Sequence, residues 1–202
     1  MSRGINGGIV GKNNETGGGV LSLTEQYLGS FIQATGGDVV DDDGDYRYHI
    51  FENSGYFQIT QGSGEIEYVI VAGGGGGSGS LGSDTYASAG GGAGGYRSSV
   101  SGERSGGDSD PESSLTLDAG IYEVVVGAGG AVGTEGPNSS FSDPSSSFSD
   151  IVAIGGGSGQ LPNSGQSADG GSGGGGGDPV ATGNAAPGTG TPEQGTDGGT
   201  PT

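Results

Sequence analysis

Two glycine-containing patterns match motifs that carry chemistry in other proteins. Gly74, Gly76 and Gly79 fit the dinucleotide-binding pattern G-x-G-x-x-G, directly after the apolar run at 68–72. That motif also needs a helix that holds the pyrophosphate, whereas residues 80–95 are mostly Gly, Ser and Ala without a helical stripe. The G-x-S-x-G pattern at 170–174 has no strand before it and no helix after it. Because 53 of the 202 residues are glycine, both matches arise easily by chance. Neither predicts a cofactor site.

Three further side chains have types suited to hydrolysis. Glu65 and Glu67 would project from one face of a strand about 6.5–7 Å apart, a separation compatible with an inverting glycosidase. The chain has no Trp to line a sugar cleft, so the sequence favours a solvated strand face. His49 is the only histidine and lies mid-strand, where packing is the commoner role. We therefore predict no catalytic residue and no enzyme activity, with a carbohydrate-active domain using Glu65 and Glu67 as the remaining alternative.

The acidic stretch formed by Asp38 and residues 41–45 resembles a calcium loop at first sight. In the calcium-loop frame that ends at Gly44, the first ligand would be Val39 and the bidentate glutamate would be Ile50. This excludes a helix-loop-helix calcium site. The sequence predicts a solvated acidic turn, with weak cation binding as the alternative, and no metal site.

Charge and composition exclude several classes of partner. Twenty-four acidic and five basic residues give a net charge of −19, which repels phosphate backbones and anionic membranes. Without cysteine there is no disulfide framework and no thiolate metal site. No apolar stretch has the length of a secretory signal or a membrane span. We expect neither nucleic-acid binding nor membrane insertion.

Hydrophobic periodicity predicts a mostly β protein with one short N-terminal helix. A capping box at Ser22 and Glu25 begins a predicted helix over 22–33. Alternating residues at 46–51, 56–60 and 65–72 predict a three-stranded antiparallel meander. Further strands are expected at 115–118, 121–126 and 148–154, with a serine-rich loop at 138–149.

Three strands run directly into glycine, in YVIVAGGGGG, YEVVVGAGG and DIVAIGGGSG. This repeated junction indicates that glycine is building material, because a cofactor loop is needed only once. Glycine tracts can form polyglycine-II-like bundles, in which extended threefold helices hydrogen-bond sideways. Ordering glycine costs roughly 0.5–1 kcal/mol more per residue than ordering alanine. The tracts are therefore either disordered, or they form many backbone hydrogen bonds or are held by an assembly. That assembly would be a homo-oligomer, with a trimer favoured, or a larger particle.

The order of motifs resembles the glycine-rich domain of tailed-bacteriophage virion structural proteins of the tail-fibre and adhesin type. The resemblance rests on HIFENSGYFQIT, EIEYVIVAGGGGGSGS, AGGGAGGYR, LTLDAGIYEVVVGAGG, NSSF and DIVAIGGGSG, and more loosely on residues 4–28, where Leu21 replaces a more usual aromatic. It implies a strand scaffold with variable loops that meet the host surface. We accordingly divide the chain into an N-terminal attachment segment (1–45), a glycine-rich β domain (46–177) and a Pro/Thr/Gly-rich acidic tail or linker (178–202).

The resemblance implies a non-enzymatic component of the virion, assembled in the host cytoplasm, in a tail fibre or tail-associated appendage. Residues 1–45 would contact other virion proteins. Loops at 78–89, 96–111 and 131–147 would be the candidate contacts with a host glycan or receptor, with Tyr86 and Tyr96 as their exposed aromatics. A head decoration or head-fibre protein is one alternative, and a secreted or surface adhesin-like binding module is another.

Overall fold

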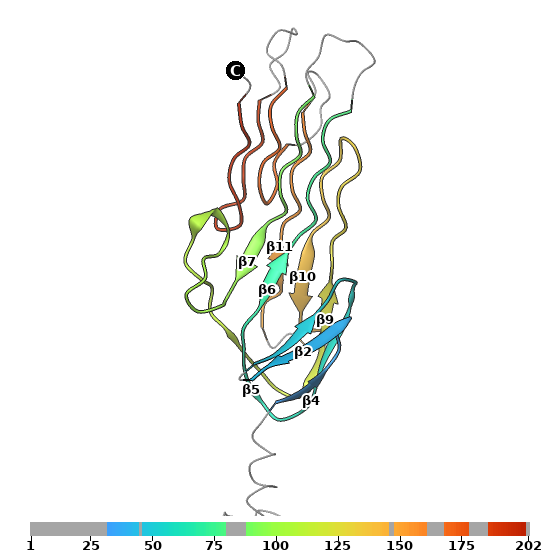
Figure 1. The fold of residues 1–202 in the computed structure, drawn as a ribbon, viewed down its shortest axis with the longest axis vertical. Helices are drawn as coiled ribbons and strands as arrows, with labels where there is room; N and C mark the ends of the chain where they lie inside the picture. The colour runs from blue at the N-terminus through green and yellow to red at the C-terminus, as the bar shows by residue number, and fades with distance from the viewer. Residues whose placement is uncertain are drawn as a thin grey trace, which may run out of the picture.

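Glycine tracts and β-strands occupy different regions of the folded molecule. A computed structural model describes residues 32–44, 46–79, 88–145, 148–160, 168–177 and 186–200. Figure 1 shows the strands in the lower part of the molecule and the extended glycine tracts side by side above them, along the long axis. The described residues are mostly β, with small antiparallel sheets and one short 3-10 turn, so the predicted fold class is confirmed.

The largest sheet has five antiparallel strands in the order β1-β4-β9-β10-β11. Its central strands alternate apolar and polar residues, which places one apolar face against the core. The strands are β1 (Gln33–Thr35), β4 (Gly55–Gln61), β9 (Gly120–Val125), β10 (Ser139–Ser142) and β11 (Ile151–Ala153).

A compact aromatic cluster fills the core behind this sheet. Phe57, Tyr122 and Phe141 lie on adjacent strands, with ring centroids 5.8–6.4 Å apart. Phe148 packs on Tyr122 and Phe141 at 6.1 and 5.6 Å. The Tyr122 hydroxyl donates a hydrogen bond to the Asp118 carbonyl at 2.8 Å, so its polar atom is satisfied. This small core anchors the strands from which the glycine tracts emerge.

The remaining strands form three two-stranded antiparallel sheets, so the predicted meander is wrong in its pairing. β3 pairs with β2, β4 pairs with β1 and β9, and β5 and β6 pair with strands more than 25 residues away. Alternation shows which face of a strand is apolar but does not specify the neighbouring strand. The strands are β2 (Val39–Asp43), β3 (Tyr46–Ile50), β5 (Gly64–Ile66), β6 (Val69–Val71), β7 (Tyr96–Ser98) and β8 (Leu115–Leu117).

Each glycine tract hydrogen-bonds to several others with a period of three residues. The clearest example is the tract at 72–79, which follows β6. Every third amide of this tract donates to the antiparallel tract at 89–95, through Ala72 to Gly95, Gly75 to Gly92 and Ser78 to Ala89, at 2.9–3.0 Å.

The other positions of the same tract face different neighbours. The amides of Gly73 and Gly76 donate to Pro137 and Thr134. The carbonyls of Gly74 and Gly77 accept from Gly130 and Gly133, and those of Gly73 and Gly76 also accept from Gly156 and Gly159. Successive residues therefore point in three directions, as they do in a helix with three residues per turn. The tracts form the predicted polyglycine-II-like bundle, built within one chain.

Glycine is required where neighbouring backbones approach most closely. A Cβ atom on Gly75 would lie within 3.0 Å of the Gly157 carbonyl, and one on Gly156 would lie equally close to the Gly92 carbonyl. In contrast, a Cβ on Gly74 would meet only the Gly92 carbonyl, at 3.7 Å. Glycine thus serves close packing at specific positions, as it does at the axis of collagen.

Residues 186–200, expected to belong to a tail or linker, are part of the bundle. The Gly198 amide donates to Gly188, and the Gly176 amide donates to Gly199. The Gln194 side chain accepts a hydrogen bond from the Ile154 amide at 2.8 Å and donates to the Val152 carbonyl at 3.2 Å. This segment therefore continues the bundle and supplies partners for the end of β11.

Three other local expectations differ from the structure. The predicted helix at 22–33 lies outside the described residues except for its last two, and Gln33 begins β1. Residues 41–43 of the expected acidic turn belong to β2, Gly44 lies in a turn with a φ of 60°, and Asp45 lies outside the described residues. The expected serine-rich loop contains β10, because Ser139 and Phe141 alternate inward.

Substitutions at two adjacent glycines test the bundle. We expect Gly75→Ala to lower the free energy of unfolding by about 3 kcal/mol, since its methyl group forces two backbones apart. Gly74→Ala is the matched control and should leave stability unchanged or raise it by about 0.4–1 kcal/mol, because alanine restricts the unfolded chain. Urea unfolding measures both values. Equal effects of the two substitutions would contradict the close packing at Gly75.

Removal of the Gln194 side chain tests the role of the C-terminal segment. We expect Gln194→Ala to lower the free energy of unfolding by about 1–3 kcal/mol, because the Ile154 amide loses its side-chain acceptor. The Val152 carbonyl keeps a hydrogen bond from Arg97. Gln58→Ala, on the exposed outer face of β4, should change it by less than about 0.5 kcal/mol. Urea unfolding distinguishes the two variants. An unchanged free energy of unfolding for Gln194→Ala would contradict the inferred role of the Gln194 side chain.

Candidate functional site

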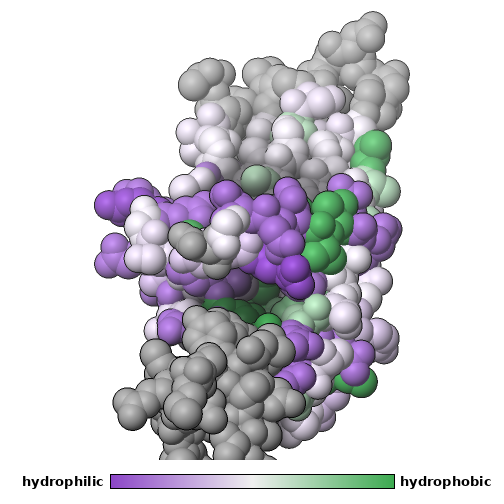
Figure 2. Space-filling model, turned by 60° about the horizontal axis from the view of Figure 1, so that its bottom comes forward, coloured by the Kyte–Doolittle hydropathy of each residue, from purple (hydrophilic) through white to green (hydrophobic). Residues whose placement is uncertain are grey.

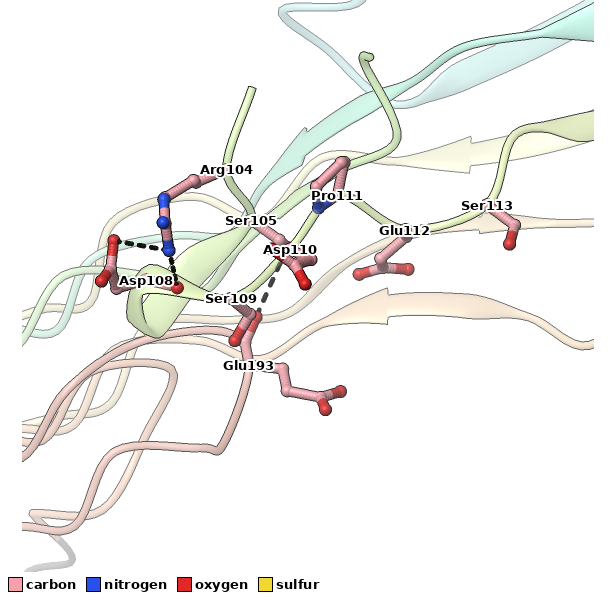
Figure 3. Close-up of a pocket in the computed structure, with 9 residues that line it drawn as sticks. All are labelled: Arg104, Ser105, Asp108, Ser109, Asp110, Pro111, Glu112, Ser113 and Glu193. Atoms are coloured by element: carbon pink, nitrogen blue, oxygen red, sulfur yellow. Dashed lines mark hydrogen bonds and ion pairs between the residues drawn. The ribbon is translucent and has the colours of Figure 1, made fainter. Parts of the chain in front are cut away.

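The loop between β7 and β8 carries a polar hollow of ≈ 660 Å³. Figure 3 shows that its side chains come from this loop and from the C-terminal segment at Glu193. Four carboxylates line it beside a single guanidinium, so its charge is strongly acidic. The lining residues are Arg104, Ser105, Asp108, Ser109, Asp110, Pro111, Glu112, Ser113 and Glu193.

One carboxylate of the hollow belongs to a half-buried hydrogen-bond network. Arg97 contacts Glu112 through Nε and a terminal guanidinium nitrogen, both at 2.6 Å, and Tyr68 donates its hydroxyl to Glu112 at 2.8 Å. Burial opposes ionisation of Glu112, but the hydrogen bonds from Arg97 and Tyr68 outweigh burial and hold the pKa of Glu112 below its ordinary value. Burial and the bond to Glu112 raise the pKa of Tyr68. The network connects the loop to β7 through Arg97 and to Tyr68, which directly precedes β6.

Two further contacts fix the loops of the hollow, one within the β7–β8 loop and one between this loop and the C-terminal segment. The Arg104 guanidinium contacts a carboxylate oxygen of Asp108 at 3.2 Å and donates to the backbone carbonyl of Asp108 at 2.6 Å (Figure 3). The Ser105 hydroxyl donates to the Glu193 carbonyl at 3.4 Å. Asp108 and Glu193 have φ values of 64° and 62°, so each loop contains a residue in the left-handed region. Among the described residues, no three acidic or histidine side chains are placed to hold a metal ion. The observed contacts give the hollow a structural role.

The two tyrosines predicted as exposed contact residues have different outcomes. Tyr86 lies outside the described residues. Tyr96 belongs to β7 and not to a loop, it is half-buried, and its hydroxyl donates to Glu103. This hydrogen bond, followed by burial, raises the pKa of Tyr96. Tyr96 is therefore neither exposed nor in a loop, and its hydroxyl binds the loop that follows β7. A host contact of this region stays a prediction. The region at 131–147 likewise contains the interior strand β10.

The residues considered for hydrolysis have hydrogen bonds or ring contacts of their own. Glu65 lies on β5 and accepts a hydrogen bond from Ser114, whereas Glu67 follows β5 and accepts from the Ser101 amide at 3.1 Å. His49 packs edge-on against Phe57, with centroids 5.1 Å apart, and its Nδ1 is 2.8 Å from the Gly36 carbonyl oxygen. Each of these side chains has a separate local contact.

Both glycine motifs of the sequence lie in the bundle. The Gly74 carbonyl and the Gly76 amide bond to neighbouring tracts. The Ser172 amide donates to the Ala93 carbonyl, and the Ser172 hydroxyl is 3.4 Å from the Thr196 amide. The backbone groups that would bind a phosphate or an oxyanion therefore bind other backbone groups.

Two carboxylates of the apparent calcium loop, Asp38 and Asp42, have local partners as well. Asp38 accepts the Glu52 and Asn53 amides at 2.8 and 2.9 Å, and these bonds lower the pKa of Asp38. Asp42 binds Arg47 at 2.7 Å. Asp45 lies outside the described residues.

The β2–β3 hairpin carries an exposed apolar face that the sequence reasoning missed. Figure 2, in which the lower part of the molecule comes forward, shows apolar side chains as separate patches among polar ones. Four of the exposed apolar residues share one face of the hairpin, which we call the hairpin face. The signal in the sequence was the alternation of Tyr46, Tyr48 and Ile50 with polar residues on β3, whereas β2 (VVDDD) does not alternate. The four residues and their exposed fractions are Val39 46%, Tyr46 57%, Tyr48 46% and Ile50 47%.

Comparison with protein families gives one match. A family model described as a glycine-rich domain matches residues 52–202, which is most of the chain. The chain belongs to this glycine-rich domain family. The matched region begins just before β4 and includes the C-terminal segment, in agreement with the place of residues 186–200 in the bundle. No curated protein and no solved structure matches the chain. In the part of the chain that the structure describes, no helix has the length and hydrophobicity needed to cross a membrane.

Acid titration tests the Glu112 network. Because the pKa of Glu112 is lowered on folding, its carboxylate stabilises the fold above its ordinary pKa of 4.5. This contribution is lost as the pH falls through the lowered value. We expect the difference in free energy of unfolding between the parent chain and Glu112→Gln to shrink as the pH falls from about 4.5 to the lowered value, and to change no further below it. Urea unfolding at a series of pH values measures it, and a difference independent of pH would contradict the role of the carboxylate.

Proposed function

We propose that this chain is a non-enzymatic structural component of a phage virion, in a tail fibre or tail-associated appendage. The observation that carries the proposal is the bundle, in which glycine tracts bonded through their backbones project from a small β base (Figure 1). Sideways bonds at every third residue give a rod that resists bending without a large hydrophobic core. A projecting part of a particle needs this property.

The chemistry of the fold is compatible with exposure outside a cell. The chain has no cysteine, so the fold does not depend on a redox state. The described hydrogen bonds of the bundle are mainly between backbone groups, which do not titrate at moderate pH. The net charge of −19 keeps copies of the rod from associating nonspecifically. The motif order that resembles phage fibre proteins adds the link to a virion.

The bundle also suggests how the chain is oriented in the particle. The glycine tracts extend away from the strands toward the opposite end of the molecule (Figure 1). Backbone bonds such as those from Ser78 to Ala89 and from Gly176 to Gly199 join them. In the proposal, the β base and the preceding residues attach the protein to other virion proteins, and the bundle points toward the host surface. A homotrimer stays a prediction, because the hydrogen bonds described here form within one chain.

Mass spectrometry of purified phage particles tests the proposal. We expect peptides of this chain among the particle proteins, and immunogold labelling on the tail. Labelling on the capsid would instead support the head-decoration alternative. Particles produced from the same genome without any peptide of this chain would contradict a virion role. A gene neighbourhood without capsid, portal or tail genes would favour the adhesin-like module of cellular origin.

A further inference from the structure

The two faces of the β2–β3 hairpin differ in their environment. In the antiparallel register, Val39 pairs with Ile50, Asp41 with Tyr48 and Asp43 with Tyr46, so these six side chains share the hairpin face. The opposite face includes His49, whose ring packs against Phe57 of the core. The hairpin face therefore points away from the core.

This arrangement reverses the usual pattern of a surface hairpin, which buries its apolar side. All five residues of β2 and four of the five in β3 are exposed. On β3, Tyr46, Tyr48 and Ile50 follow one another along the hairpin face, and the two tyrosine rings are 6.3 Å apart. An isolated two-stranded hairpin is only marginally stable in water. Covering the apolar face would stabilise the hairpin as well as the complex.

We propose that the hairpin face docks on a separate protein whose contact surface is apolar at its centre and basic at its rim. Asp41 and Asp43 lie on the hairpin face without a basic residue of the hairpin beside them, since Arg47 lies on the other face with Asp42. Basic groups of the partner would complement these two carboxylates. Tyrosine is enriched at the centre of protein interfaces, where its ring is buried and its hydroxyl finds a partner.

Two other occupants fit the hairpin face less well. A second copy of this chain, itself carrying a net charge of −19, would bring acidic surfaces together. A glycan could hydrogen-bond to Asp41 and Asp43 and stack on the tyrosine rings, but Val39 and Ile50 would offer its hydroxyls only aliphatic surface. The docking rests on the proposed function, because it identifies the hairpin face as the part of the chain that binds another virion protein.

Loading of variants into particles tests the docking. Phage lacking this gene are grown in cells that supply the full-length chain from a plasmid, and copies per particle are measured with isotope-labelled peptide standards. The test variants are Tyr46→Ser/Tyr48→Ser and the charge reversal Asp41→Lys/Asp43→Lys. The matched control is Tyr56→Ser, whose side chain is 60% exposed on the outer face of β4. Thermal unfolding of each purified variant establishes that it is folded.

We expect the parent chain and Tyr56→Ser to load equally, and both hairpin variants to load about tenfold less or lower. Equal loading of the folded hairpin variants would overturn the docking while the virion function stands. Normal loading with weaker adsorption to host cells would also overturn it, in favour of a glycan contact. Absence of the parent chain from all particles would overturn the proposed function, and the docking with it.

Discussion

Hydrogen bonds between glycine backbones are the interaction on which the rest of this structure depends. An ordinary domain gains most of its stability by burying apolar side chains, but apolar side chains are only a minor part of this sequence. Here the aromatic cluster around Phe57, Tyr122 and Phe141 covers only the β base. Above it, order requires that nearly every third peptide group of a tract find a partner on the same neighbour. Glycine makes this possible because its missing side chain lets the carbonyl of one tract approach the Cα of the next.

The two parts of the molecule depend on each other. The five-stranded sheet fixes where β9 and β11 end, and the pairing of β6 with β7 fixes where β6 ends. Each of these three strands leads a glycine tract into the bundle. The tracts would otherwise lose more conformational entropy on ordering than residues with side chains do. The network of Arg97 and Glu112 and the side chain of Gln194 connect the loops and the C-terminal segment to the same strand ends. These polar side chains thus connect the β base to the bundle through hydrogen bonds and an ion pair.

Sequence reasoning predicted the architecture better than the connections. The repeated run of a strand into glycine was sufficient to predict polyglycine-II-like tracts, and alternation located most strands. Strand pairing could not be predicted, because the partner of Phe57 on β9 is about 65 residues away and many registers satisfy a period of two. The strand β10 was not predicted because its only large apolar residue is Phe141 and its other three residues are serines. The segment at 186–200 has the composition of a linker, and composition alone does not distinguish a flexible glycine-rich chain from one packed in a bundle. The oligomer was expected because the tracts needed partners, and the tracts of a single chain supply them.

Hydrogen exchange of glycine amides in the isolated monomer tests this account most directly. The chain is kept at a concentration where light scattering gives the monomer mass of 19.3 kDa, and exchange is followed at Gly75, Gly92 and Gly157. Each of these amides donates to another tract, so the account predicts exchange at least about a hundredfold slower than in the unfolded chain. Exchange at the unfolded rate in a monomer whose β base is protected would contradict it. The bundle would then form only in an assembly.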